Sequence, residues 1–291
     1  MGDRALILGG GGPIGIAWEL GLAAGLEEGG VRIADANRIV GTSAGSFAGA
    51  ALASGRSAEA LVRAQVEEAA RIAAARSAAG DTARPVPDLG PLMRFMARRP
   101  ADGEPPVELL AEIGTFALSA KTMPEETFIS SFGSVTGPTE RWPRGFACTA
   151  VDASDGSFQV WEESSGIELG RAIASSCSVP GIFPPITIGG RRYIDGGMRS
   201  ATNIDLAKGF RRVLVVAVLS NMALEMMRTG IEREITELKS AGATVELIVP
   251  DATCRDAFGN NLMDGSRRGS VALAGVAQGR AEAGRIKPFW S

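Results

Sequence analysis

Residues 5–15 read ALILGGGGPIG and residues 39–45 read IVGTSAG, and the architecture of the chain follows from these two stretches. Each begins with a short apolar run and turns at glycines, as a buried strand of a parallel sheet does before it enters a helix. Residues 14–28 have helical spacing and are stopped by two glycines. A small-residue helix is expected at 44–53. Strand, helix, strand and helix in this order predict a βαβ unit.

The remaining sequence continues the alternation of strands and helices. Short apolar runs predict further strands at 146–151, 158–161, 187–188, 192–194, 213–219 and 245–249. Helical spacing predicts helices at 57–78, 89–98, 106–120, 167–176, 223–241 and 266–286, with Ser57 as an N-cap. We therefore expect one α/β domain over residues 1–291, with a mainly parallel central sheet flanked by helices. Residues 57–135 are expected to form a mainly helical insertion or lid.

The composition indicates a globular protein that does not bind nucleic acid. Hydrophobic residues make up 45% of the chain, which suffices for a packed core, and the net charge is −3. Neither a basic excess nor an abundance of aromatic residues marks a nucleic-acid surface. The three cysteines, Cys148, Cys177 and Cys254, form no C-x-x-C pair, and the chain has no histidine. A disulfide framework and a zinc site are therefore not expected.

The N-terminal residues carry one basic side chain, Arg4, and only a short apolar run before the glycines. This pattern does not match a signal peptide. No stretch reaches the roughly 20 apolar residues that a membrane-spanning helix needs. We expect a soluble, cytoplasmic protein whose membrane contact, if it has any, is peripheral.

A serine nucleophile is indicated by Gly41–Gly45, which has the pattern G-x-S-x-G between a predicted strand and a predicted helix. This turn presents a serine, here Ser43, at the edge of the sheet, where the following helix N-terminus faces developing negative charge. The alternative is that Ser43 only caps that helix. A serine hydroxyl needs an adjacent base, and without histidine the base cannot be an imidazole.

Asp195 is the candidate base. It ends a predicted strand and is followed by Gly196 and Gly197, which let another part of the backbone come close. Asp-Gly-Gly is also a common turn, so the motif gains weight only because the serine needs a partner. An aspartate is a weak base for an alcohol, and burial or positioning must assist it.

The glycine loop matches G-x-G-x-x-G at Gly10, Gly12 and Gly15. Such a loop supplies backbone N–H groups at a helix N-terminus, which can hold a pyrophosphate or an oxyanion, or it serves packing alone. A nucleotide site would also need an acidic residue about 20 positions further on. Asp35 is available but precedes the second strand, and this alternative leaves Ser43 and Asp195 without a role.

Taken in this order, the three motifs resemble those of the patatin-like phospholipase family. The family's pattern is a glycine-rich oxyanion loop, a G-x-S-x-G elbow and D-G-[G/A]. The similarity covers roughly residues 4–56 and 145–220, including ASSCSVPGIFPP at 174–185. The resemblance implies an α/β fold and hydrolysis of the acyl esters of phospholipids, lysophospholipids or acylglycerols. It implies neither a metal nor an organic cofactor.

The resemblance also implies a Ser-Asp dyad, in which Ser43 attacks the ester carbonyl to form an acyl-enzyme. Asp195 would accept the serine proton and later activate water. The oxyanion would be held by backbone N–H groups of four residues: Gly10, Gly11, Gly12 and Ala44. An acyltransferase and a catalytically silent acyl-binding relative are further alternatives.

One departure from the family pattern is Ile14, where the family often has arginine. A cation is therefore missing from the loop, which leaves neutral esters and thioesters open as substrates. Three arginines close to Asp195 in sequence either supply charge or are solvated strand ends: Arg191, Arg192 and Arg199.

An apolar cluster falls within the predicted insertion, next to Arg94, Arg98 and Arg99; its members are Leu89, Leu92, Met93, Phe95 and Met96. Flexible apolar side chains beside arginines suit a lid or a membrane-touching helix. An ordinary core-facing helix with a solvated basic end has the same pattern.

Overall fold

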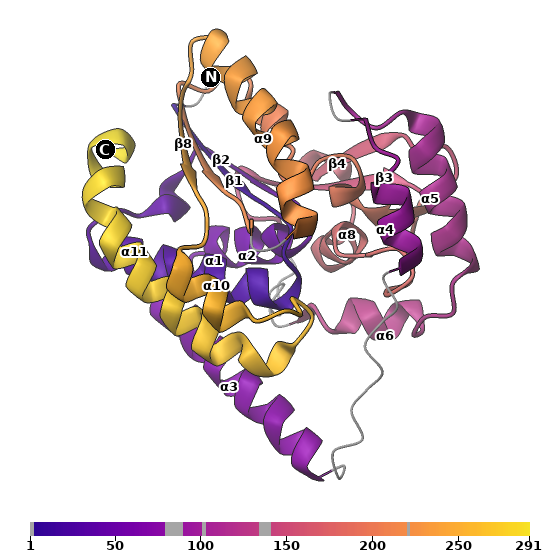
Figure 1. Cartoon of the computed structure of the whole chain (residues 1–291), viewed down its shortest axis with the longest axis horizontal. Coiled ribbons are helices and arrows are strands. Elements are labelled where there is room, and N and C mark those ends of the chain that lie inside the picture. Colours follow the sequence, from indigo (N-terminus) through magenta and orange to yellow (C-terminus); the bar gives the residue numbers. More distant parts are fainter. Residues whose placement is uncertain (1–2, 79–89, 101–102, 134–140, 220–221) are drawn as a thin grey trace.

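The computed structural model describes residues 3–78, 90–100, 103–133, 141–219 and 222–291, with side chains omitted at 222–227. A central sheet lies between helices on its two faces (Figure 1). Leu89, a member of the predicted apolar cluster, falls outside the described residues. Among the helices of the described residues, none combines the length and the hydropathy that spanning a membrane requires.

The sheet is mixed and mainly parallel, as predicted. Its strands are β1 (Arg4–Leu8), β2 (Arg38–Gly41), β3 (Phe146–Asp152), β4 (Phe158–Glu162), β5 (Ile186–Ile188), β6 (Arg191–Asp195), β7 (Arg212–Val216) and β8 (Thr244–Ile248). They lie in the order β5-β6-β3-β2-β1-β7-β8, with β4 paired to β3. The pairings among β1, β2, β3, β7 and β8 are parallel, whereas β4, β5 and β6 join through antiparallel pairings. The C-terminal ends of β1 and β2 therefore lie at one edge of the sheet.

The α-helices of the described residues are α1 (Gly12–Glu28), α2 (Ala44–Ala53), α3 (Ala58–Ala78), α4 (Gly90–Met96), α5 (Val107–Ser119), α6 (Glu125–Ser130), α8 (Leu169–Ser176), α9 (Met222–Ser240), α10 (Ala252–Phe258) and α11 (Arg268–Trp290). The predicted helices are present with small shifts of their ends. Ser57 caps α3, since its Oγ accepts the Ala60 N–H at 3.2 Å. The short helices α6 and α10 were not predicted, because fewer than two full turns give little periodicity.

The alternation of side chains along β1 divides the core in two. Leu6 and Leu8 face a cluster formed with α1, α2, α8 and α11. Ala5 and Ile7 face the opposite cluster, which includes residues of β7, β8 and α9. Because successive side chains of a strand point to opposite faces, one apolar run fills both layers.

Helices α1 and α11 pack closely through glycines. A Cβ placed on Gly21 would lie 2.1 Å from the Ala272 carbonyl oxygen, and one on Gly279 would lie 2.3 Å from the Leu22 carbonyl oxygen. Neither position can carry a side chain without moving the helices apart. This contact holds α1 in place, and the N-terminus of α1 is the glycine loop.

The predicted insertion contributes two separate layers. Helix α3 packs against α1 and α11. Helix α4 buries Leu92 and Met96 in a third cluster with Leu110 and Ile113 of α5. Met93 on the same helix is exposed. The described helices of the predicted insertion therefore pack in two separate places, α3 against α1 and α11, and α4 against α5.

Candidate active site

The backbone at Ser43 is strained in the way a nucleophile elbow requires. Ser43 lies between β2 and α2 with φ 53° and ψ −118°, a region that non-glycine residues seldom occupy. At Gly41 and Gly45, on either side of Ser43, other backbone atoms lie too close to leave room for a side chain. A Cβ on Gly41 would lie 2.3 Å from the Gly45 carbonyl oxygen, and one on Gly45 would lie 2.2 Å from the Leu8 carbonyl oxygen. The glycines of the motif are therefore needed to make the turn.

Hydrogen bonds tie the elbow to the end of β1. The Thr42 N–H donates to the Leu8 carbonyl at 3.0 Å, and the Gly45 N–H donates to the Gly9 carbonyl at 3.0 Å. A strained backbone persists only where its surroundings hold it. The glycine loop and the serine turn are thus held as one unit.

The segment that ends α8 also supports the elbow. The Ser43 N–H donates to the Ser176 Oγ at 3.0 Å. The Ser43 carbonyl accepts from the Ser46 Oγ at 2.6 Å and from the Cys177 Sγ at 3.1 Å. Both polar groups of the Ser43 peptide are therefore satisfied, and its side chain remains available for chemistry. Cys177 is buried, and burial raises the pKa of its thiol, so the thiol stays protonated at neutral pH.

Asp195 ends β6 and lies within reach of Ser43. Its side chain is only 2% exposed, and its Oδ1 accepts the Gly197 N–H at 2.7 Å. Burial raises the pKa of Asp195 from 3.8 to about 7, and hydrogen bonds from the Ser43 hydroxyl and the Gly197 N–H oppose that rise. A pKa near 7 suits a general base at neutral pH. The structure thus brings the two predicted dyad residues together.

A buried polar network that the sequence did not reveal lies below the dyad. The Thr42 Oγ1 and the Thr149 Oγ1 are 3.1 Å apart, and the Asn203 Nδ2 donates to the Thr42 Oγ1 at 3.0 Å. The same Nδ2 reaches the Gly196 carbonyl at 3.5 Å. Asn203 therefore connects the serine turn to the turn that follows Asp195. Asn203 has a left-handed φ of 51°, but no sequence motif marks this position.

The glycine loop presents free backbone donors next to Ser43. The N–H groups of Gly11, Gly12 and Ala44 have no hydrogen-bond acceptor within the described part of the chain. They lie at the N-termini of α1 and α2, where the first N–H groups have no partner in the helix and the dipole favours negative charge. Gly15 brings the two helix ends together, because a Cβ there would lie 3.3 Å from the Ala44 Cβ.

Gly10 differs from the other glycines of the predicted oxyanion hole. Its N–H already donates to the Ala201 carbonyl at 3.0 Å. It is nevertheless close to the nucleophile, since a Cβ on Gly10 would lie 3.5 Å from the Ser43 Cβ. Gly10 thus leaves room for Ser43, and the unpaired donors are those of Gly11, Gly12 and Ala44.

The loop contributes no cationic side chain. Ile14 is fully buried and belongs to the core. The guanidinium groups of the three arginines close to Asp195 have other partners: Arg191 binds Asp152 and Asp155, Arg192 binds the Pro185 carbonyl, and Arg199 binds Glu104 and Asp205. No cluster of three or more metal-ligating side chains occurs among the described residues.

Comparison with solved structures finds distant likenesses. VipD from Legionella pneumophila is 13% identical, with a TM-score of 0.45 and coverage of 97% of this chain and 67% of VipD. ExoU in its complex with SpcU from Pseudomonas aeruginosa is 18% identical, with a TM-score of 0.40 and coverage of 96% of this chain and 52% of that chain. The present chain therefore spans about half the length of that ExoU chain. No curated protein sequence matches it.

The family model described as patatin-like phospholipase matches residues 6–208. This range is more than half of the chain and includes the glycine loop, the serine turn and Asp195. The chain belongs to the patatin-like phospholipase family.

Proposed function

We propose that this protein hydrolyses fatty-acyl esters of lipids, such as phospholipids, lysophospholipids or acylglycerols, with Ser43 as nucleophile and Asp195 as base. The observation that carries the proposal is the pairing of a serine on a strained turn with a buried carboxyl whose pKa is about 7, in a chain without histidine. Family membership supports lipid acyl hydrolysis in general terms.

In the first half-reaction, the Ser43 Oγ attacks the ester carbonyl carbon while the Asp195 carboxylate takes the hydroxyl proton. The carbonyl oxygen becomes an oxyanion, which in this proposal is stabilised by the free N–H groups of Gly11, Gly12 and Ala44. Collapse of this intermediate breaks the bond to the alcohol. The leaving alkoxide takes the proton from Asp195, and Ser43 remains acylated.

In the second half-reaction, Asp195 takes a proton from water as the water oxygen attacks the acyl-enzyme. Collapse of the second intermediate releases the fatty acid, and the proton returns to the Ser43 oxygen. An acyltransferase shares the first half-reaction and differs only in replacing water by an acceptor alcohol. Release of free fatty acid without added acceptor therefore identifies the hydrolase.

The proposal is tested by measuring the release of fatty acid from a long-chain ester in detergent micelles. Ser43→Ala and Asp195→Ala are each expected to lower kcat/KM at least about a thousandfold with retained folding. Ser54→Ala, the same chemical change at the other end of α2, is the matched control and is expected to keep wild-type activity. Full activity in either dyad variant would refute the assignment, and an inactive wild type would point to a silent relative.

A further inference from the structure

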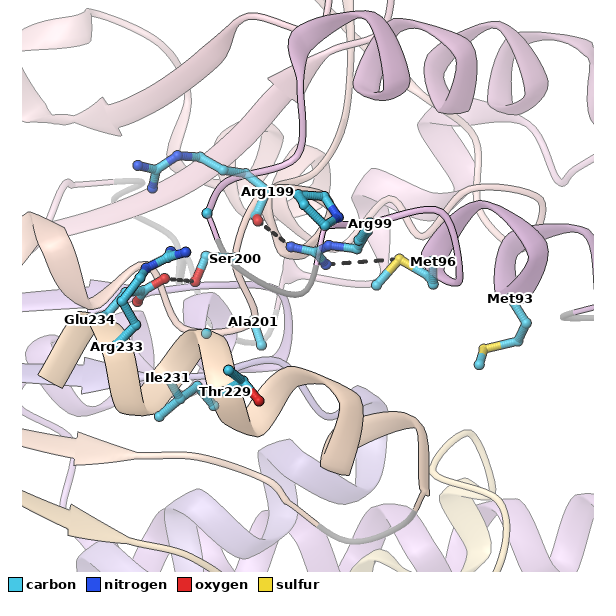
Figure 2. Close-up of a pocket in the computed structure, with 13 residues that line it drawn as sticks. Met93, Met96, Arg99, Arg199, Ser200, Ala201, Thr229, Ile231, Arg233 and Glu234 are labelled. Carbon is cyan, nitrogen blue, oxygen red and sulfur yellow. Dashed lines mark hydrogen bonds between the residues drawn. The ribbon is translucent and has the colours of Figure 1, made fainter. Parts of the chain in front are cut away.

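A cavity of about 300 Å³ lies beside the candidate active site and has no role in the mechanism above. It lies between α4 with the residues after it, the backbone at 199–201, and α9 (Figure 2). Its wall combines apolar side chains, Met93, Met96 and Ile231, with the guanidinium-bearing Arg99 and Arg233. A volume at the lower end of ligand pockets fits a headgroup rather than a whole lipid.

The cavity is adjacent to the nucleophile. The backbone at 199–201 follows the Asp195 turn, and the Ala201 carbonyl, in the cavity wall, accepts the Gly10 N–H at 3.0 Å. A Cβ on Gly10 would lie 3.5 Å from the Ser43 Cβ and 3.9 Å from the Ala201 carbonyl oxygen. Ser43 and the cavity wall therefore lie within 4 Å of one common point.

Arg99 is a partly buried cation that forms no salt bridge among the described residues, although the charge of Glu234 acts on it. Its guanidinium donates to the Arg199 carbonyl and approaches the Met96 Sδ at 3.9 Å, as Figure 2 shows. No carboxylate of the described residues lies within 4 Å of it. Burial lowers the pKa of Arg99, but a guanidinium stays protonated at neutral pH. A partly buried charge that makes no direct contact with a carboxylate is costly, and an anionic ligand would offset that cost.

Arg233 on α9 supplies a second incompletely paired guanidinium. Its Nη1 is buried and has no hydrogen-bond partner within the described chain. Its Nε lies 3.5 Å from the mostly exposed Glu237. Glu234 also lines the cavity, but its carboxyl oxygens accept hydrogen bonds from the Ser200 Oγ at 2.7 Å and the Ile204 N–H at 2.9 Å, and burial raises its pKa. The two arginines thus offer donors to the cavity that the protein itself does not use.

We propose that this cavity is a subsite for the phosphate group of a lipid acyl ester, bound by Arg99 and Arg233. The assignment rests on the proposed function, because it names the class of ester that Ser43 receives. Guanidinium groups hold phosphate through paired, charge-assisted hydrogen bonds. The carbon skeleton next to the phosphate contacts Met93, Met96 and Ile231.

The spacing within a glycerophospholipid matches this adjacency. Its phosphorus atom lies five covalent bonds from the carbonyl carbon of the nearer ester, a span of roughly 6 Å. A phosphate on an ester bound at Ser43 is therefore within reach of the Ala201 backbone, which lines the cavity. The glycine loop, residues 9–15, has no cationic side chain of its own to hold it.

Binding to catalytically disabled protein tests the subsite separately from hydrolysis. Ser43→Ala is titrated calorimetrically with dihexanoylphosphatidic acid, with neutral dihexanoylglycerol and with inorganic phosphate. We expect the acidic lipid to bind at least about tenfold more tightly than either of the other two. Adding Arg99→Met or Arg233→Met is expected to remove at least about tenfold of that affinity.

Arg94→Met is the matched control, since Arg94 is exposed on α4 and does not line the cavity. It removes the same charge and is expected to leave binding unchanged. Equal affinity for the acidic and neutral lipids, or an equal loss in Arg94→Met, overturns the subsite. Binding of inorganic phosphate as tight as that of the lipid would show a site for free phosphate instead. If Arg99→Met does not fold, Arg233→Met gives the same test.

Kinetics separate failure of this proposal from failure of the proposed function. The ratio of kcat/KM for the acidic lipid to that for the neutral lipid is expected to fall at least about tenfold in Arg99→Met and Arg233→Met and to stay constant in Arg94→Met. A wild type that cleaves both lipids equally refutes the subsite alone. A wild type that binds the acidic lipid through Arg99 but cleaves neither lipid refutes the hydrolase alone.

Discussion

Asp195→Asn is expected to stabilise the protein at alkaline pH while it removes catalysis. The wild-type carboxyl is 2% exposed, and burial raises its pKa from 3.8 to about 7. Above pH 7 the folded protein must therefore keep a poorly solvated carboxylate. Asparagine has nearly the same shape, still accepts the Gly197 N–H through its Oδ1, and carries no charge.

The magnitude follows from the two pKa values. Between pH 4 and 7 the folded state holds a proton that the unfolded state releases, so the free energy of unfolding falls as pH rises through this window. At about 1.4 kcal/mol for each pH unit between the folded and unfolded pKa values, ionisation of Asp195 costs about 4 kcal/mol well above pH 7. Of this cost, about 2–3 kcal/mol develops between pH 5 and pH 8.

Urea denaturation of the wild type and Asp195→Asn at pH 5 and pH 8 measures this cost directly. The difference in unfolding free energy is expected to move in favour of Asp195→Asn by about 2–3 kcal/mol from the lower to the higher pH. Asp256→Asn, the same change at an exposed position of α10, is the matched control. If the difference in unfolding free energy between the wild type and Asp195→Asn is the same at pH 5 and pH 8, the conclusion that buried Asp195 retains its proton up to about pH 7 is refuted.

Three further predictions follow from the same structure. For a neutral ester, kcat/KM is expected to rise with pH through a midpoint near 7, as Asp195 loses its proton, and a pH-independent rate between 5 and 9 would contradict its role as base. Gly45→Ala is expected to lower the thermal midpoint of unfolding strongly, because its Cβ would lie 2.2 Å from the Leu8 carbonyl oxygen. Gly284→Ala, in open space on α11, is expected to raise the midpoint slightly. Equal midpoints for the two variants would refute the close packing around the serine turn. Glu19 is fully buried, and burial raises the pKa of its carboxyl well above the ordinary value although the Gly9 backbone N–H opposes the rise. Glu19→Gln is therefore expected to have nearly the wild-type free energy of unfolding at pH 6 and to become more stable than the wild type as pH rises. Urea denaturation of both proteins at pH 6 and at an alkaline pH measures this difference.

The sequence predicts those parts of the site that depend on local backbone geometry. The turn at Ser43 cannot form without glycine at positions 41 and 45, and a parallel strand that ends in a tight turn must be a short apolar run followed by glycines. Glycine at these positions is needed for the turn itself, so the motif is visible in the sequence, even though the atom that excludes a side chain at Gly45 is the Leu8 carbonyl oxygen of another strand. The same holds for the positions of the strands and of the longer helices.

Contacts between distant segments leave no such pattern. Asn203 joins Thr42 of the serine turn to Thr149 of strand β3, and nothing in the residues next to Asn203 marks it. The sequence places Arg99 beside an apolar cluster, on a lid or membrane-touching helix or at a solvated basic helix end. Neither interpretation predicts its contact with the backbone at residue 199, a hundred positions away. The pairing of glycines between α1 and α11 is hidden for the same reason.

The central claim is that Ser43 is an activated nucleophile, and covalent labelling tests it most directly. Wild type and Ser43→Ala are treated with a long-chain fluorophosphonate, with and without detergent micelles, and their intact masses are compared. The account predicts one adduct on the wild type and none on Ser43→Ala. A folded wild type that forms no adduct under either condition, or an equal adduct on Ser43→Ala, would contradict it.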